Sequence, residues 1–72
     1  MEFESFDELV KYLKLFIGLR IELSCAEWDD RAEEDGILKG VVDDEMLGVC
    51  AVFEDLDYLM PLSTRDVRVK LL

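Results

Sequence analysis

Closely spaced carboxylates are the residues of this sequence that could do chemistry. Five of the eight residues at positions 29–36 are acidic, and the last of the eight is glycine. Calcium requires oxygen ligands of this kind, and its EF-hand loop has an invariant glycine at the sixth position. If Gly36 takes that position, Arg31 falls at the first ligand position and Val42 replaces the bidentate glutamate. The spacing therefore predicts a solvated acidic loop and no metal site.

Two adjacent carboxylate pairs, Asp43 with Asp44 and Glu54 with Asp55, are candidates for general acid–base catalysis. Such catalysis needs a carboxyl group whose pKa is shifted by burial or by a neighbour, whereas adjacent residues in a polar turn stay solvated and point apart. The sequence contains no histidine and no nucleophile or phosphate-binding motif. It also lacks the base that would activate Cys50 as a nucleophile. We therefore expect a protein that is not an enzyme and that needs no cofactor.

The net charge of −10 is concentrated in the middle of the chain. Residues 22–57 carry thirteen carboxylates against Arg31 and Lys39, whereas residues 58–72 are mildly basic. Such a field repels phosphate backbones, so direct nucleic-acid binding is not expected. The sign instead predicts a basic protein, or a nucleic-acid-binding protein, as the partner.

Two aromatic residues border the acidic segments. Trp28 precedes the first acidic loop, and Tyr58 follows the last one. Tryptophan is enriched at interface hot spots, although Trp28 could equally cover the core as a lid. The predicted partner-binding surface combines these aromatic residues with the acidic loops: Trp28, Asp29, Asp30, Glu33, Glu34, Asp35, Asp43, Asp44, Glu45, Glu54, Asp55, Asp57 and Tyr58.

A helix is predicted over residues 5–17, ahead of the acidic segments. Ser5 and Glu8 have the spacing of a capping box, and Gly18 stands where a left-handed residue ends a helix. Apolar residues recur at three- and four-residue spacing, which predicts one face packed on the rest of the domain. These residues are Phe6, Leu9, Val10, Leu13, Phe16 and Ile17.

Five short strands are predicted after the helix, because apolar residues alternate with polar ones and acidic turns interrupt them. The predicted strands cover residues 19–28, 37–42, 46–53, 58–62 and 67–71, with an exposed loop at residues 29–36. Gly40 predicts a bulge or sharp bend in the second strand. Pro61 confines the fourth strand to an edge of the sheet or to a strand end.

The two cysteines, Cys25 and Cys50, each lie in an apolar run without CxxC spacing. Because nothing resembling a signal peptide precedes them, we expect buried, reduced thiols in a cytoplasmic protein. A disulfide between Cys25 and Cys50 is the alternative if their strands are neighbours. No uncharged run approaches the roughly 20 apolar residues that span a bilayer, so no membrane-spanning segment is expected.

One helix followed by five short strands, with residues 36–43 (GILKGVVD) and a tight turn within residues 58–69, resembles the SH3-like and Sm-like small barrels. The first segment is similar to the second Sm-like strand, in which two glycines enclose an apolar stretch and an acidic residue follows. The resemblance implies an α+β, mainly β, barrel, with an open sheet packed on the helix as the alternative. Sm-like RNA binding also needs an Arg/Lys-Gly pair, which is absent, so RNA binding is not implied.

The sequence as a whole predicts a single domain that acts as an acidic protein-interaction module. Two other functions stay open. One is an inhibitor that imitates nucleic acid, which needs carboxylates spaced like phosphates along one face. The other is a structural subunit of a homo-oligomer joined through edge strands, since a chain of 72 residues buries only about 60% of its unfolded surface by itself.

Overall fold

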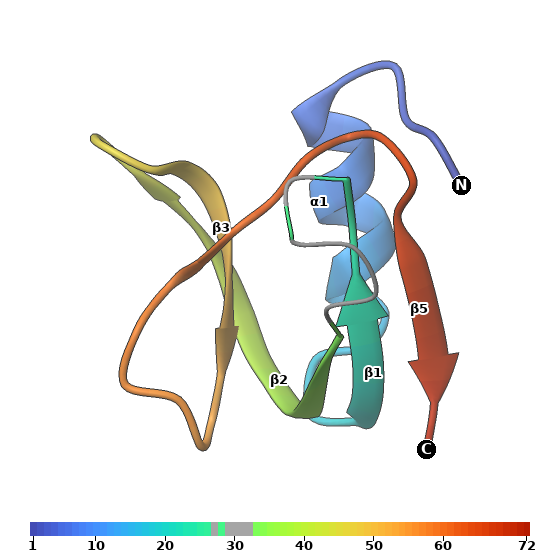
Figure 1. Cartoon of the computed structure of the whole chain (residues 1–72), viewed down its shortest axis with the longest axis vertical. Helices are drawn as coiled ribbons and strands as arrows, with labels where there is room; N and C mark the ends of the chain where they lie inside the picture. The colour runs from blue at the N-terminus through green and yellow to red at the C-terminus, as the bar shows by residue number, and fades with distance from the viewer. Residues whose placement is uncertain (27, 29–32) are drawn as a thin grey trace.

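The computed structural model describes residues 1–26, 28 and 33–72, and it shows one helix followed by a five-stranded antiparallel sheet (Figure 1). The helix α1 (Phe6–Lys14) begins where the capping signal predicts. The Ser5 hydroxyl accepts a hydrogen bond from the Glu8 N–H at 3.3 Å. The Glu8 carboxylate accepts one from the N–H of Glu4, the residue before the N-cap, at 3.2 Å, so the pair resembles a capping box displaced by one residue.

The C-terminal end of α1 tightens into a narrower turn. The N–H groups of Leu15, Phe16 and Ile17 each donate to the carbonyl three residues earlier, at 3.2, 2.9 and 3.4 Å. This pattern is typical of a 3₁₀ turn, so the predicted end at residue 17 marks the end of this extension and not of the α-helix. Gly18 follows with a φ of 86°, the left-handed conformation that the sequence predicts for it.

The sheet has the strand order β4-β3-β2-β1-β5 and is open, with β4 and β5 at its edges. The strands are β1 (Arg20–Ser24), β2 (Glu34–Asp44), β3 (Gly48–Phe53), β4 (Met60–Pro61) and β5 (Arg68–Leu71). The predicted class, α+β and mainly β, is confirmed, and the open sheet is the architecture formed. The edge position of Pro61 is confirmed as well.

The long strand β2 bends the sheet. Its residues 34–37 pair with β1, and its residues 38–44 pair with β3. Between these parts the register with β3 shifts from Leu38 to Gly40, which is the bulge that Gly40 predicts. Beyond the bend, β2 and β3 turn away from β1 and β5 (Figure 1).

The start of β2 differs from the prediction. The sequence predicts residues 34–36 in an exposed loop, but Glu34 and Asp35 pair with Leu23 and Glu22 of β1. Gly36 is buried within the strand, and a Cβ added there would lie 3.4 Å from the Phe53 ring. That distance is an ordinary van der Waals contact, so Gly36 packs on Phe53 as part of a strand and does not form the predicted turn. Pairing with a neighbouring strand outweighed the low strand propensity of acidic residues.

The turn between β2 and β3 lies two residues later in the chain than predicted. Only residues 45–47 form the turn, so Asp43 and Asp44 belong to β2. Met46, predicted in the third strand, lies in the turn and is 92% exposed. The turn is this short because Gly48 adopts a φ of 79°, which lets the chain reverse within three residues.

The core lies between α1 and the bent sheet. Its buried residues come from the helix, from β1, β2 and β3, and from the segments after β1, after β4 and before β5: Leu9, Leu13, Ile21, Leu23, Cys25, Leu38, Ala51, Phe53, Leu62 and Val67. Burying one large apolar side chain contributes about 1.5–3 kcal/mol, so this cluster fixes the helix on the sheet. Cys25 and Cys50 are both buried, as predicted, and they are not bonded to each other in the structure.

Candidate partner-binding groove

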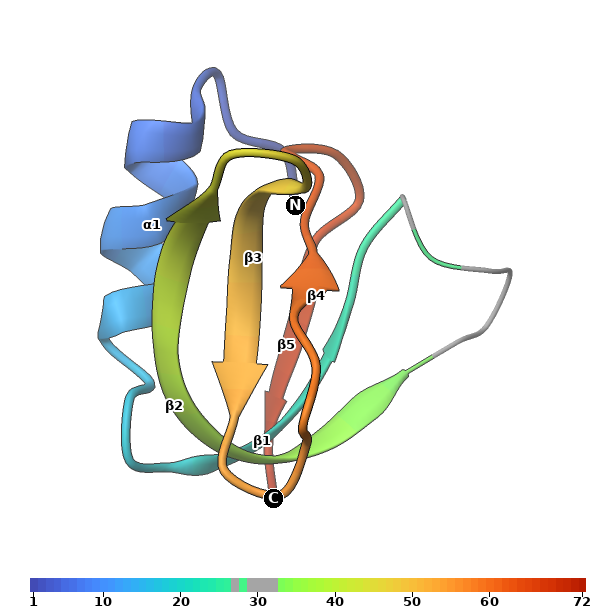
Figure 2. The same ribbon diagram turned by 90° about the vertical axis from the view of Figure 1, so that its left-hand side faces the viewer.

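A groove lies between α1 and the second half of β2. It exists because β1 accompanies β2 only over residues 34–37, whereas α1 lies beside the rest of the strand (Figure 2). A helix beside a strand edge does not fill the space that another paired strand would occupy. The resulting groove has a volume of about 470 Å³, within the range of ligand-binding clefts.

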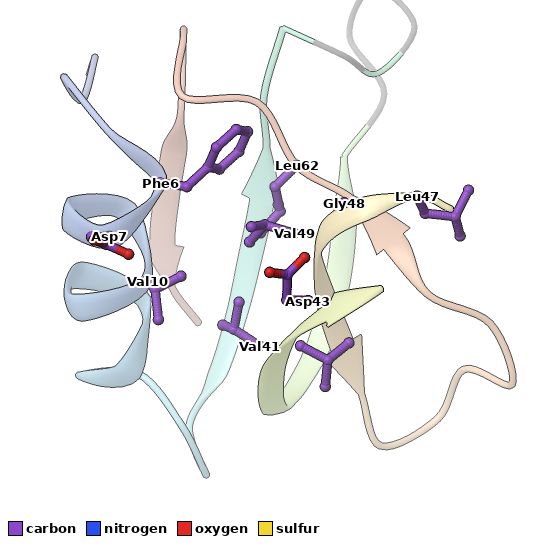
Figure 3. Close-up of a pocket in the computed structure, with 10 residues that line it drawn as sticks. Phe6, Asp7, Val10, Val41, Asp43, Leu47, Gly48, Val49 and Leu62 are labelled. Carbon is purple, nitrogen blue, oxygen red and sulfur yellow. The ribbon is translucent and has the colours of Figure 1, made fainter. Parts of the chain in front are cut away.

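The lining of the groove is mostly apolar, and its two ionisable groups are both carboxylates. It is formed by Phe6, Asp7, Val10, Val41, Val42, Asp43, Leu47, Gly48, Val49 and Leu62. Figure 3 shows Phe6 and Val10 projecting from the helix toward Val41, Val49 and Leu62 on the sheet side. Among the residues that the structure describes, no lysine, arginine or histidine contributes to this lining.

The helix side of the groove follows from the spacing of the apolar stripe. Phe6 and Val10 are four residues apart and therefore lie one above the other on one side of α1. Leu9 and Leu13, on the neighbouring side, are fully buried in the core, whereas Phe6 remains 42% exposed. The apolar stripe of α1 is thus wider than the core can cover, and its remainder faces the groove.

The hairpin side is held by Asp44. Its carboxylate oxygen Oδ2 accepts hydrogen bonds from the N–H groups of Met46 and Leu47, both at 2.9 Å. This local bonding is typical of aspartate at a turn and makes Asp44 a structural residue of the hairpin. The turn leaves Leu47 51% exposed at the end of the groove.

Asp43 places a negative charge among the apolar residues of the groove. On the same face of the hairpin it is paired with Val49, two residues from Val41, and its carboxylate points into the space between helix and sheet (Figure 3). Burial raises the pKa of the neighbouring Cys50 thiol, and the charges of Asp44 and Asp43 raise it further. The thiol therefore stays protonated at neutral pH and is a poor nucleophile.

The arrangement offers apolar contacts and the negative charge of two carboxylates. Residues that could hold a metal ion are not clustered anywhere in the described part of the chain. The described helix is too short to cross a membrane.

No protein-family model, curated protein or solved structure matches this chain.

The acidic residues predicted for partner binding are not brought together into one surface. Asp43, Asp44 and Glu45 lie at one end of β3, and Glu54, Asp55 and Asp57 lie at the other end. Figure 2 shows these two turns at opposite ends of the strand. Asp29 and Asp30 lie outside the described residues.

A third acidic group lies on the β1–β2 part of the sheet. Glu22 stands opposite Asp35 on one side and Lys70 on the other. A hydrogen bond with the Glu33 carboxyl raises the pKa of Glu22, with further contributions from burial and from the charges of Glu33 and Asp35, whereas Lys70 lowers it. Like charges are thus held together here at a cost to the fold.

The two aromatic residues predicted as anchors have different surroundings. Trp28 is half-buried and packs against the core, and its indole N–H donates a hydrogen bond to the Pro61 carbonyl at 2.6 Å. It therefore ties the segment after β1 to the edge strand β4, as the lid alternative implies. Tyr58 is 57% exposed near the loop after β3 and remains accessible.

Sequence reasoning missed the groove residues Phe6, Val10, Val41, Leu47 and Val49. One signal could have indicated the helix side of the groove. The apolar stripe on α1 spans six residues, more than one helix face needs for a core of this size. A second is the apolar pair at residues 46–47, which stands alone between acidic residues and a glycine. The opposing wall depends on where β1 separates from β2, which no local pattern reports.

Proposed function

We propose that the chain is a non-enzymatic interaction module that recruits a basic protein, or a nucleic-acid-binding protein, through its acidic surface. The observation that carries this proposal is that the carboxylates are hardly neutralised within the fold. Among the residues that the structure describes, a single ion pair forms, between Arg68 and Asp66 at 3.1 Å, and both side chains are exposed. The remaining charge is available to a partner of opposite sign, whose association it would accelerate and whose affinity salt would reduce.

Recruitment of a protein is favoured over imitation of nucleic acid by the placement of the charges. Imitation needs carboxylates in a continuous row with phosphate-like spacing. The acidic turns before and after β3 are separated by the length of that strand, and its described residues are apolar. Two separate acidic sites match the surface of a basic protein better than they match a groove that binds a nucleic-acid duplex.

We further propose that the fold is a variant of the SH3-like or Sm-like small barrel. Its support is the shared strand β2, which pairs with β1 before the bulge and with β3 after it. Such a bend curls a short sheet toward closure.

The homo-oligomer alternative would join β4 of one copy to β5 of the next. Two features of these edges oppose it. β4 is only two residues long and includes Pro61, and β5 presents the charged residues Arg68 and Lys70. Short, charged and proline-containing edges discourage pairing between sheets, so we place recruitment first.

The proposed function is tested by size-exclusion chromatography with light scattering at low and high salt, followed by affinity capture from the source lysate. We expect a monomer that retains basic proteins at low salt and releases them at high salt. A monomer that retains no basic or nucleic-acid-binding protein would contradict the proposal, and a stable ring or dimer would favour the homo-oligomer alternative.

Two charge variants locate the contact. Asp43→Asn with Glu45→Gln removes two charges before β3, and Glu54→Gln with Asp55→Asn removes two charges after it. Both leave Asp44 intact, so the hairpin turn keeps its hydrogen bonds. Equal retention by both variants and by the original protein would show that neither acidic turn recruits the partner.

A further inference from the structure

We propose that the groove between α1 and the β2–β3 hairpin is the docking site of the recruited protein, and that it takes a peptide segment in which a few apolar side chains stand next to lysine or arginine. This inference rests on the proposed function and specifies its site and the chemistry of its partner. The groove is open on one side, and its lining leaves Phe6, Val42 and Leu47 between 41% and 51% exposed.

The apolar lining determines the first part of the partner's chemistry. Val41, Val49 and Leu62 already pack on the core or belong to it, so their positions are fixed before a ligand arrives. A preformed apolar floor loses little conformational entropy on binding, and each side chain inserted into it removes apolar surface from water. The exposed Met46, next to Leu47, extends this apolar surface beyond the groove.

The charges of the groove determine the second part of the partner's chemistry. Asp7 lies on the helix wall and Asp43 on the strand wall, and no lysine or arginine of the described part of the chain lines the groove. Glu45 is exposed in the adjoining turn. An apolar segment flanked by lysine or arginine would place its anchors on the valines while its cations meet these carboxylates. This is the common recognition mode in which an amphipathic segment lies in an apolar groove.

Other occupants fit the charges less well. A second copy that used the same patch in a symmetric contact would bring Asp7 and Asp43 against carboxylates of its own kind. A nucleic acid or an anionic membrane surface would meet the same repulsion. The chemistry of the site therefore selects a basic segment of another protein.

The test uses two synthetic peptides of about 12 residues, with the spacing of an amphipathic helix. One carries leucine at the anchor positions and lysine elsewhere, and the other replaces each leucine with serine and keeps the lysines. Binding is measured by fluorescence anisotropy at low and high salt, and contacts are mapped by amide chemical-shift changes in the ¹⁵N-labelled protein. We expect the leucine peptide to bind at least about tenfold more tightly and to shift the amides of residues 6–10 and 41–49.

Matched variants separate the groove from general charge attraction. Phe6→Ala should weaken binding of the leucine peptide by about fivefold to tenfold, and Asp43→Asn by about twofold to fourfold, because an exposed ion pair contributes less than an apolar anchor. Leu15→Ala, just after α1, and Glu2→Gln, before it, change exposed residues outside the groove and should leave its affinity unchanged. Asp43→Lys should weaken it further than Asp43→Asn does, and folding of each variant is checked by circular dichroism.

The outcomes distinguish the groove from the proposed function. If both peptides bind equally, lose affinity with salt and shift residues 54–58, charge recruitment stands and the groove is rejected. If the leucine peptide binds but Phe6→Ala and Asp43→Asn change nothing, the groove is likewise rejected. If neither peptide binds at low salt, both proposals fall. Tight binding of the leucine peptide that maps to the groove and responds to both variants supports the inference.

Discussion

The two acidic turns at the ends of β3 are similar in charge but differ in what surrounds them. The turn before β3 adjoins the groove, and it exposes Met46 and Leu47 beside its carboxylates. After β3, Leu56 instead turns inward, packs against the core and donates its N–H to the Phe53 carbonyl. None of residues 54–58 lines the groove.

This difference shows why charge count alone does not define a binding site. Exposed ion pairs contribute little to affinity, typically less than about 1 kcal/mol each, because water and salt screen them. Apolar surface that is already ordered supplies the larger share of binding energy. Of the two turns, only the one before β3 adjoins such a surface among the described residues.

The largest expected effect comes from comparing a buried residue at the end of β3 with an exposed residue just before β3. Phe53 is 1% exposed, whereas Leu47 is 51% exposed. Phe53→Ala should lower the free energy of unfolding by about 3–5 kcal/mol, and Leu47→Ala by less than about 0.5 kcal/mol. Urea unfolding followed by circular dichroism measures both.

Phe53→Leu keeps the comparison measurable if Phe53→Ala does not fold, because it leaves a smaller cavity and should cost less. Similar losses for Phe53→Leu and Leu47→Ala would contradict the assignment of Leu47 to a free surface.

A smaller effect is expected from the turn residues themselves. Asp44→Ala removes the acceptor of two backbone N–H groups and should destabilise the protein by about 1 kcal/mol. Asp55, whose side chain makes no hydrogen bond with a described residue, is the matched control, and Asp55→Ala should cost less than about 0.5 kcal/mol. Equal unfolding midpoints for the two variants would show that the hairpin does not depend on Asp44.

Much of the fold could be predicted because its signals are local. Ser5 caps α1 through its own side chain, Gly18 takes a left-handed φ, and Pro61 cannot serve an interior strand. Each of these depends on residues close in the sequence. The bulge beside Gly40 is of the same kind, since glycine within a strand pattern weakens regular pairing.

The start of β2 and the groove could not be predicted, because both depend on contacts between distant segments. The local sequence predicts Glu34 and Asp35 as loop residues, because only the structure shows that β1 pairs with their backbone. Likewise, Val41 and Val49 have the pattern of core residues, and whether they are fully covered depends on the position of α1. The hydrophobic pattern predicted which residues would face inward but not where the helix would leave them uncovered.

The smallest expected effect tests the third acidic group, where charge acts on the fold itself. Because the pKa of Glu22 is raised, the native state holds its proton more tightly than the unfolded chain does. Ionised Glu22 therefore disfavours the native state at neutral pH. This cost is relieved as the pH falls through the native-state pKa, and the gain is complete once the pH lies below the unfolded-state pKa.

Glu22→Gln should accordingly stabilise the protein at neutral pH and make its stability rise less on acidification than that of the original protein. Glu54→Gln, in the exposed turn after β3, serves as the control for the general effect of removing one negative charge. Unfolding is followed in urea at a series of pH values, because the difference between the two variants isolates the contribution of the Glu22, Glu33 and Asp35 cluster. If the two variants had parallel pH profiles, the repulsion within this cluster would be no greater than that of the surface as a whole. If the difference in stability between the two variants changed with pH, the acidic cluster on the sheet would reduce stability locally. The acidic residues beside the groove are instead positioned to contact a partner.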